Sequence, residues 1–188
     1  MPLSAALLAA VTADPPLLHL PAGVLRPLCE SDAASIAMHA DDEQVWRNLF
    51  EGFPRPYTLQ HVRDWCGGAW RSPDFGQVWA IDVHGEAIGC IGVRPEHGWL
   101  ACNAEVGYWL GRAHWGRGIA TQALAAATQW AWSALPQVHR LYAPIYARNP
   151  ASQRVAAKAG YVLEGQMPKS CIKAGEVIDR VVYACYRP

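Results

Sequence analysis

The chain has no excess of charge of either sign, because its 16 Lys and Arg residues are balanced by 16 Asp and Glu residues. It has no basic run, and it therefore lacks the positive surface that a dedicated nucleic-acid-binding protein or a polybasic membrane anchor needs. No segment reaches the roughly 20 consecutive apolar residues that cross a bilayer. The composition thus argues against nucleic acid and membranes as partners and favours a small molecule or a peptide end.

Cysteine and histidine are not arranged for metal binding. The six cysteines show no C-x-x-C pair and do not cluster with histidines, so zinc-ligand spacing is absent. We expect most of them to be buried thiols in a reducing cytosol, and no metal is implied. The apolar stretch at 3–13 imitates a signal peptide only loosely, because no Lys or Arg precedes it. The sequence therefore predicts a cytoplasmic protein.

No internal repeat or low-complexity linker divides the 188 residues, a length typical of one domain. We predict a single domain over residues 1–188, in which residues 1–20 form an N-terminal extension. Prolines at 15, 16 and 21 separate this extension from a first strand at 24–28. An accessory helix is expected ahead of that strand.

Polar caps predict three helices in the first third of the chain. One begins at Ser31-Asp32, a second at Asp41-Asp42 and a third at Thr58. The second helix would place four apolar residues on a single face. These residues are Val45, Trp46, Leu49 and Phe50.

Runs of β-forming residues predict the rest of the sheet. They lie at 77–83, 86–93, 101–110, 139–145, 161–164 and 177–186, and His84-Gly85 predicts a hairpin turn between the first two. Helices are predicted at 119–135 and 151–159. The crossover from 101–110 to 139–145 makes one parallel strand pair. The predicted fold class is α+β, with a mixed, mostly antiparallel sheet flanked by helices.

The strongest local signal is a strand that runs into a glycine-punctuated helix start at 108–121 (YWLGRAHWGRGIAT). Free backbone N–H groups of the first helical turn, aided by the helix dipole and Arg117, suit a pyrophosphate. Gly116 and Gly118 permit its close approach. No Gly-Lys-Ser/Thr follows, and the third glycine of a dinucleotide fingerprint is missing. The simpler alternative is that these glycines only make a strand-to-helix turn.

Three segments, in this order and spacing, resemble the GNAT acetyltransferases, and specifically the RimJ/RimL branch of ribosomal-protein N-terminal acetyltransferases. They are Leu25-Arg26-Pro27-Leu28 with Ser31-Asp32, then 105–110 leading into 115–121, and then Asn149 to Ser152 with Lys158 to Tyr161. The resemblance implies the GNAT fold, in which a central parallel strand pair splays apart around the pantetheine arm of coenzyme A. Here these strands are 101–110 and 139–145.

The resemblance also implies the residues that bind the cofactor. The coenzyme A pyrophosphate would lie on Trp115, Gly116, Arg117, Gly118, Ile119, Ala120 and Thr121. Trp115 replaces the Gln or Arg that usually opens this pattern, a change that is common in this branch. Asn149 would hydrogen-bond the pantetheine, and a backbone N–H near Trp109 or Leu110 would bind the oxyanion.

Two residues are candidates for proton transfer. Many GNAT enzymes carry a tyrosine seven residues after the asparagine, as general acid to the thiolate, but Ala156 occupies that position here. Ser152 lies one helical turn before it on the same face, and it is therefore the candidate acid, unless it only caps the helix.

Glu105 lies where some GNAT families keep a general base for the amine. A solvated carboxylate at a strand end is the alternative, and His114 and His139 compete for the same role.

The sequence therefore predicts an N-acetyltransferase that uses acetyl-CoA and needs no metal. Its acceptor would be a primary amine, either a protein N-terminal α-amine or a small molecule such as an antibiotic, attacked directly through a tetrahedral intermediate. A non-catalytic acyl-CoA-binding regulatory module and a nucleotide-binding protein remain as rival functions. Monomer and homodimer are both open.

Overall fold

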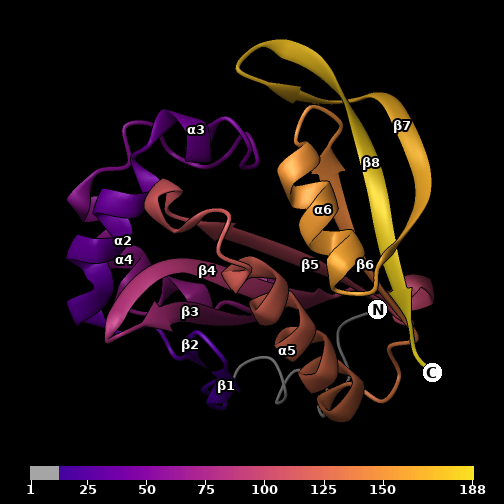
Figure 1. The fold of residues 1–188 in the computed structure, drawn as a ribbon, viewed down its shortest axis with the longest axis horizontal. Coiled ribbons are helices and arrows are strands. Elements are labelled where there is room, and N and C mark those ends of the chain that lie inside the picture. The colour runs from indigo at the N-terminus through magenta and orange to yellow at the C-terminus, as the bar shows by residue number, and fades with distance from the viewer. Residues whose placement is uncertain (1–12) are drawn as a thin grey trace.

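The computed structural model describes residues 13–188, which form one eight-stranded sheet with helices packed on both faces (Figure 1). The spatial order is β1-β2-β3-β4-β5-β6-β8-β7, and only β5 and β6 run parallel. This confirms the predicted fold class. The strands are β1 Leu18–Leu20, β2 Gly23–Arg26, β3 Gln77–Val83, β4 Glu86–Pro95, β5 Asn103–Leu110, β6 Arg140–Tyr146, β7 Val162–Lys173 and β8 Glu176–Tyr186.

The α-helices are α2 Ala33–Ala40, α3 Glu43–Trp46, α4 Leu59–Cys66, α5 Ile119–Ala134 and α6 Pro150–Lys158. Two of the predicted helix caps form, at Asp42 and Thr58, whereas Asp32 ahead of α2 makes no side-chain cap. The Asp42 carboxylate accepts hydrogen bonds from the backbone N–H groups of Gln44 and Val45, which confirms the predicted cap of α3. Thr58 caps α4 in the same way. No helix within residues 13–188 has the length and apolar character to span a bilayer.

Two hydrophobic cores lie on the two faces of the sheet. Successive side chains of a strand point to opposite faces, so Trp79 and Ile81 join the core under α5, whereas Val78 and Ala80 join the core under α2 and α4. Covering both faces explains why six consecutive residues of β3 are buried. The same holds for β5, two strands along the sheet: Val106 and Leu110 join the core under α5, whereas Trp109 packs against the core under α2 and α4.

The central feature is a gap between β5 and β6. The two strands pair only at Asn103↔Arg140, Ala104↔Leu141 and Glu105↔Tyr142. Beyond Glu105, β5 continues along β4 as far as Leu110 without a β6 partner. Helix α6 follows β6 and lies beside this gap (Figure 1). The predicted splay of the parallel pair is therefore present.

The accessory helix expected ahead of the first strand falls largely on residues 1–12, which lie outside the described part of the chain. Residues 18–20 form strand β1, because they pair with β2. Two other sequence-based expectations are wrong. Helix α3 ends at Trp46, and Phe50 is 62% exposed, so the predicted apolar face does not form. Only Cys66 and Cys90 are buried.

Strands β7 and β8 extend further than predicted and form a long hairpin (Figure 1). Gly165 and Pro168 resemble strand breakers in the sequence, but register shifts at 163–165 and 167–171 absorb them without ending the pairing. The hairpin turns at Ala174-Gly175, where both residues have positive φ.

Candidate active site

The predicted phosphate loop has the geometry of an anion site. Gly116 and Gly118 have φ of 77° and 75°, a region that favours glycine, and Gly118 begins α5 without any side-chain cap. The N–H groups of Ile119, Ala120 and Thr121 therefore lack the acceptors that later turns of the helix supply. Helix α5 is 16 residues long, and its dipole adds positive potential at this end.

Trp115 holds the loop against the end of β5. Its indole Nε1 donates to the carbonyl of Leu110 at 2.8 Å, although the side chain is 42% exposed. The residue that departs from the superfamily pattern thus has a structural contact of its own, within the short turn from strand to helix.

The hydrogen-bonding phase of β5 decides which backbone groups face the gap. Gly111 N–H donates to Ile88 and Glu96 N–H donates to the Asn103 carbonyl, so odd-numbered residues of β5 bond β4. The N–H groups of Tyr108 and Leu110 consequently point to the open side. Of the two oxyanion donors suggested by the sequence, Leu110 has this orientation and Trp109 does not.

Glu105 lies on the last rung before β5 and β6 separate. Its carboxylate forms an ion pair of 2.6 Å with Arg94 on β4, and 30% of the side chain is exposed. The interaction with Glu105 raises the pKa of the Arg94 guanidinium against the opposing effect of burial. Glu105 is thus a held carboxylate at the base of the gap, on the α2 and α4 face of the sheet, and not a freely solvated one.

Ser152 lies at the opposite face, and its hydroxyl does not cap α6. Instead, the Asn149 side chain accepts the Ser152 N–H at 3.1 Å and serves as the cap. The Ser152 hydroxyl oxygen lies 3.0 Å from the Tyr108 hydroxyl, which also donates to the Ser152 carbonyl at 3.1 Å. The cap interpretation of the Ser152 side chain is therefore wrong.

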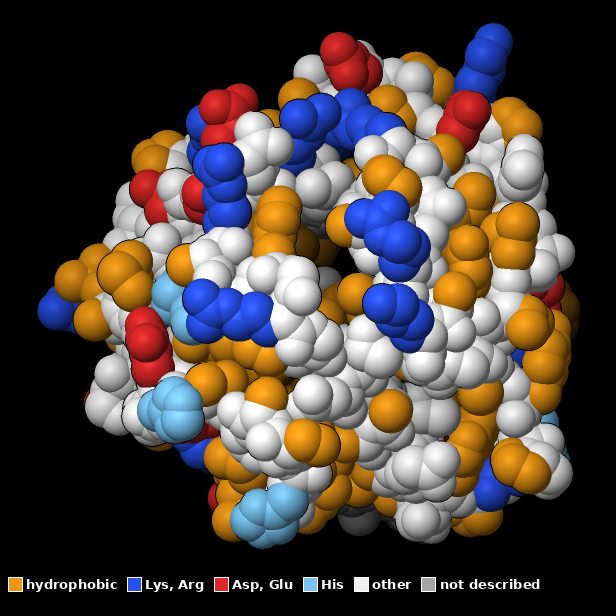
Figure 2. All heavy atoms as spheres, viewed as in Figure 1, with side chains coloured by type: hydrophobic (Ala, Val, Ile, Leu, Met, Phe, Trp, Pro, Cys, Tyr) orange, Lys and Arg blue, Asp and Glu red, His pale blue; other side chains and the backbone are white. Residues whose placement is uncertain are grey.

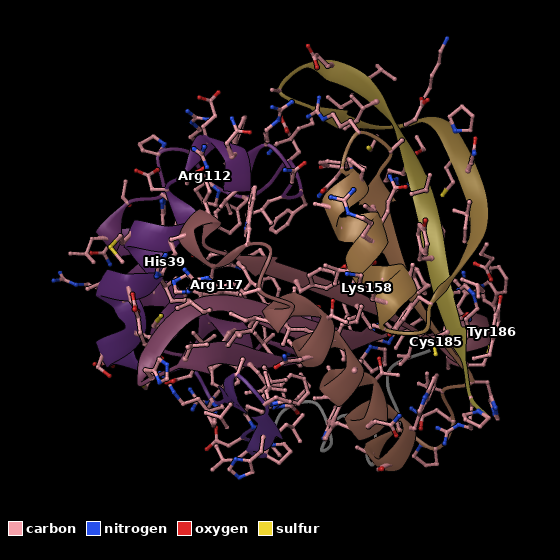
Figure 3. All side chains as sticks on the ribbon, in the orientation of Figure 1. His39, Arg112, Arg117, Lys158, Cys185 and Tyr186 are labelled. Atoms are coloured by element: carbon pink, nitrogen blue, oxygen red, sulfur yellow. The ribbon has the colours of Figure 1, made fainter. Side chains whose placement is uncertain are left out.

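Aromatic residues pack against Trp109 of β5, on the face of the sheet that carries Glu105. Phe53 packs at 4.5 Å from Tyr57 and at 6.4 Å from Trp109, measured between ring centroids. Nearby, a hollow of about 620 Å³ is lined by Asp41, Trp46, Arg55 and Pro56. Figure 2 shows a separate hollow near the centre of the molecule with Lys and Arg side chains on either side. Figure 3 labels Arg117 and Lys158 on opposite sides of that central region.

The two histidines considered as bases have different surroundings. His139 is exposed and precedes β6, at the end of the strand away from the gap. His114 lies in the loop, and its pKa is lowered by burial and by the charges of His39 and Arg117. Within residues 13–188, His39, Glu86 and His114 form the one group of metal-ligand type, with ligand atoms within 4.8 Å of one another.

This histidine cluster is better explained by hydrogen bonding than by metal binding. His39 Nε2 already bonds Glu86 at 2.9 Å. That separation is shorter than the roughly 3.4 Å that lies between two ligand atoms of a tetrahedral zinc ion with bonds of about 2.1 Å.

Sequence reasoning missed two residues of the site. The sequence indicates Tyr108 only as a residue of the strand. The alternation of side chains along a strand, which puts Tyr108 and Glu105 on opposite faces of the sheet, is the signal that could have identified it. Arg94 could be found only from the register of β4 on β5, because it lies 11 residues from Glu105 in sequence.

Comparison with known proteins agrees with this geometry. Residues 24–162 match the family described as acetyltransferase (GNAT) domain. A ribosomal-protein-serine acetyltransferase of Escherichia coli (strain K12) is 36% identical over 108 residues, covering 56% of this chain and 55% of that protein. An uncharacterised N-acetyltransferase of Bacillus subtilis (strain 168) is 26% identical over 180 residues, covering 92% and 98%.

A solved structure, Mycobacterium smegmatis RimJ in complex with CoA-disulfide, superposes with a TM-score of 0.79 at 27% identity, covering 94% of this chain and 88% of that one. The family match and these relatives place the chain among the transferases of acyl groups. The chain belongs to the GNAT family, and it is an acyl-CoA-dependent N-acetyltransferase.

Replacing Gly118 with valine should abolish the increase in melting temperature that acetyl-CoA causes in the wild-type protein. No protein atom blocks a side chain at Gly118, so the expected loss comes from the positive φ and from the bulk placed where the phosphate approaches. Gly175→Val is the matched control, because Gly175 has φ of 79° in the distant β7–β8 turn. Unaltered acetyl-CoA affinity in folded Gly118→Val would contradict the assignment of the loop.

Proposed function

We propose that this protein transfers an acetyl group from acetyl-CoA to the α-amine at the N-terminus of a protein chain. The observation that carries the proposal is the placement of Glu105 and Ser152 on opposite faces of the sheet, on either side of the β5–β6 gap. An amine can approach from one face while the thiolate leaves on the other. The ribosomal-protein-serine acetyltransferase of Escherichia coli among the relatives supports a protein acceptor.

Each site residue has a defined task in this proposal. The N–H groups of Ile119 to Thr121 bind the pyrophosphate with Arg117, and the Asn149 side chain bonds the pantetheine. Bound acetyl-CoA supplies a thioester carbonyl and a thiolate leaving group. The Leu110 N–H stabilises negative charge on the carbonyl oxygen, since it faces the gap and lacks a β6 partner.

The proton balance links Glu105 to Ser152. Glu105, through water, accepts a proton from the amine nitrogen as the N–C bond forms. Ser152 donates a proton to sulfur as the C–S bond breaks. Solvent then removes the proton from Glu105, and a solvent proton restores the Ser152 hydroxyl. Over one cycle the amine loses a proton and the thiol gains one.

The acceptor face also suits a small-molecule amine. A hollow of about 620 Å³, lined by Asp41, Trp46, Arg55 and Pro56, falls in the size range of small-ligand pockets, and it is open to solvent. The open side leaves room for a polypeptide to continue away from its α-amine. An acceptor panel therefore decides between the two substrate classes.

The test is acetyl transfer to matched peptides, with thiol release and mass measured together. One peptide has a free α-amine and begins with Ser or Ala, a second is N-terminally blocked and carries Lys, and small amines complete the panel. We expect the free peptide to react at least about tenfold faster, with the acetyl group on its α-nitrogen. Faster reaction of the blocked peptide or of a small amine would overturn the proposed acceptor class.

A further inference from the structure

A pair of hydroxyl groups bridges β5 and α6 beside the gap. The Tyr108 hydroxyl lies 3.0 Å from Ser152 Oγ and 3.1 Å from the Ser152 carbonyl oxygen. Both residues are partly buried. Asn149 occupies the Ser152 backbone N–H, and Ala156, one turn further along α6, has no side chain that can donate. In the described part of the chain, Tyr108 is thus the hydrogen-bond partner of the Ser152 hydroxyl.

The number of protons on this pair limits what it can do. Burial raises the pKa of Tyr108 to about 12, so the phenol keeps its single proton at neutral pH. If Tyr108 donates to Ser152 Oγ, the serine proton is free for a third group. If Tyr108 donates to the Ser152 carbonyl, the serine proton is instead directed at the phenol oxygen. Tyr108 therefore controls the direction in which Ser152 donates.

A second tyrosine in the same core shows what a purely structural pair looks like. The Tyr161 hydroxyl lies 2.8 Å from Thr128 Oγ1, and Thr128 donates to the Leu124 carbonyl at 2.7 Å. All donors of that pair end within the protein. Within residues 13–188, no backbone carbonyl accepts a hydrogen bond from the Ser152 hydroxyl, so its proton has no fixed destination there apart from the phenol.

We propose that Tyr108 is a positioning residue that donates to Ser152 Oγ and thereby turns the Ser152 proton toward the departing sulfur. This inference rests on the proposed role of Ser152 as the acid. A hydroxyl that accepts one hydrogen bond becomes a stronger donor in the next, so the pair stabilises developing thiolate charge better than Ser152 alone. The proton that moves is that of Ser152, and Tyr108 keeps its own.

The first test is Tyr108→Phe, which removes the phenol oxygen and keeps the ring. We expect the single-turnover rate of acetyl transfer to fall about tenfold, the size of one hydrogen bond, while the Kd of acetyl-CoA changes less than about twofold. Tyr161→Phe is the matched control and should lower the melting temperature without slowing transfer. A wild-type rate in Tyr108→Phe, with Ser152→Ala impaired, would overturn the inference and leave the proposed function standing.

A double-mutant cycle separates the two hypotheses. Because Tyr108 acts through Ser152, Tyr108→Phe should cause no further loss of rate in the Ser152→Ala background. Additive losses would overturn the inference. Wild-type rates in both single variants would overturn the proposed acid together with it. A tighter Kd for acetyl-CoA in Tyr108→Phe with full rate would also overturn it, since the pair would then only obstruct the gap.

A replacement that is nearly the same size as tyrosine gives a rate effect that packing does not explain. Fluorotyrosines at position 108 lower the pKa of the phenol and make it a stronger donor with little change in volume. We expect the single-turnover rate to rise as that pKa falls, at pH values where the phenol stays protonated. The same series at position 161 should leave the rate unchanged, and equal responses at both positions would count against the proposal.

Discussion

Ser152→Ala is expected to slow acetyl transfer by about ten- to a thousandfold, the range for a lost proton donor or a lost transition-state hydrogen bond. The affinity for acetyl-CoA should change far less, because Asn149 keeps its side chain and still caps α6. The Tyr108 hydroxyl also still has an acceptor within reach, because the carbonyl oxygen of residue 152 lies 3.1 Å away. Single-turnover rate and melting temperature, measured on the same purified variant, check this expectation.

The structure makes this test sharper than the sequence alone allowed. A capping serine would cost about 1 kcal/mol of stability when removed, but the cap belongs to Asn149 and not to Ser152. Ser152→Thr keeps a hydroxyl at the position and should retain most of the rate. A stability loss with an unchanged single-turnover rate in Ser152→Ala would rule out Ser152 as the acid.

Much of the fold could be predicted because local signals coincide with global packing. The hairpin turn at His84-Gly85 has two residues of positive φ, and Pro150 and Gly160 bound α6 as their chemistry requires. The helix α5 matches its prediction within one residue at its C-terminal end. In each case a residue with a strong backbone preference marks the boundary.

The failures share a different cause. Two segments, residues 18–20 and the middle of β7, are strands because a neighbouring strand supplies their hydrogen bonds. Their own side chains do not predict this pairing. The partner of Glu105 and the partner of Ser152 likewise depend on register and on helix placement. Tyr108 and Ser152 are 44 residues apart in sequence, so their contact arises only from tertiary structure.

Glu105→Gln is expected to lower kcat about a hundredfold, because an amide cannot accept a proton from the amine. Acetyl-CoA affinity should be kept, since the phosphate loop begins well beyond Glu105 on the chain. We expect Glu105 to act through water. The gap is open at Tyr108, and Tyr108 lies three residues, or about 10 Å, beyond Glu105 along β5. A carboxylate at the base of the gap therefore needs a water molecule between it and the amine.

The loss of an ion pair is the competing explanation for any defect in Glu105→Gln, because Arg94 would lose its partner. Glu164→Gln is the matched control: Glu164 also pairs with an arginine, Arg140, and this pairing lowers its pKa to about 2. It lies on the outer strand β7, away from the gap. If Glu105 is the base, only Glu105→Gln loses turnover; near wild-type kcat in that variant, once chemistry is shown to be rate-limiting, would leave Glu105 as the ion-pair partner of Arg94.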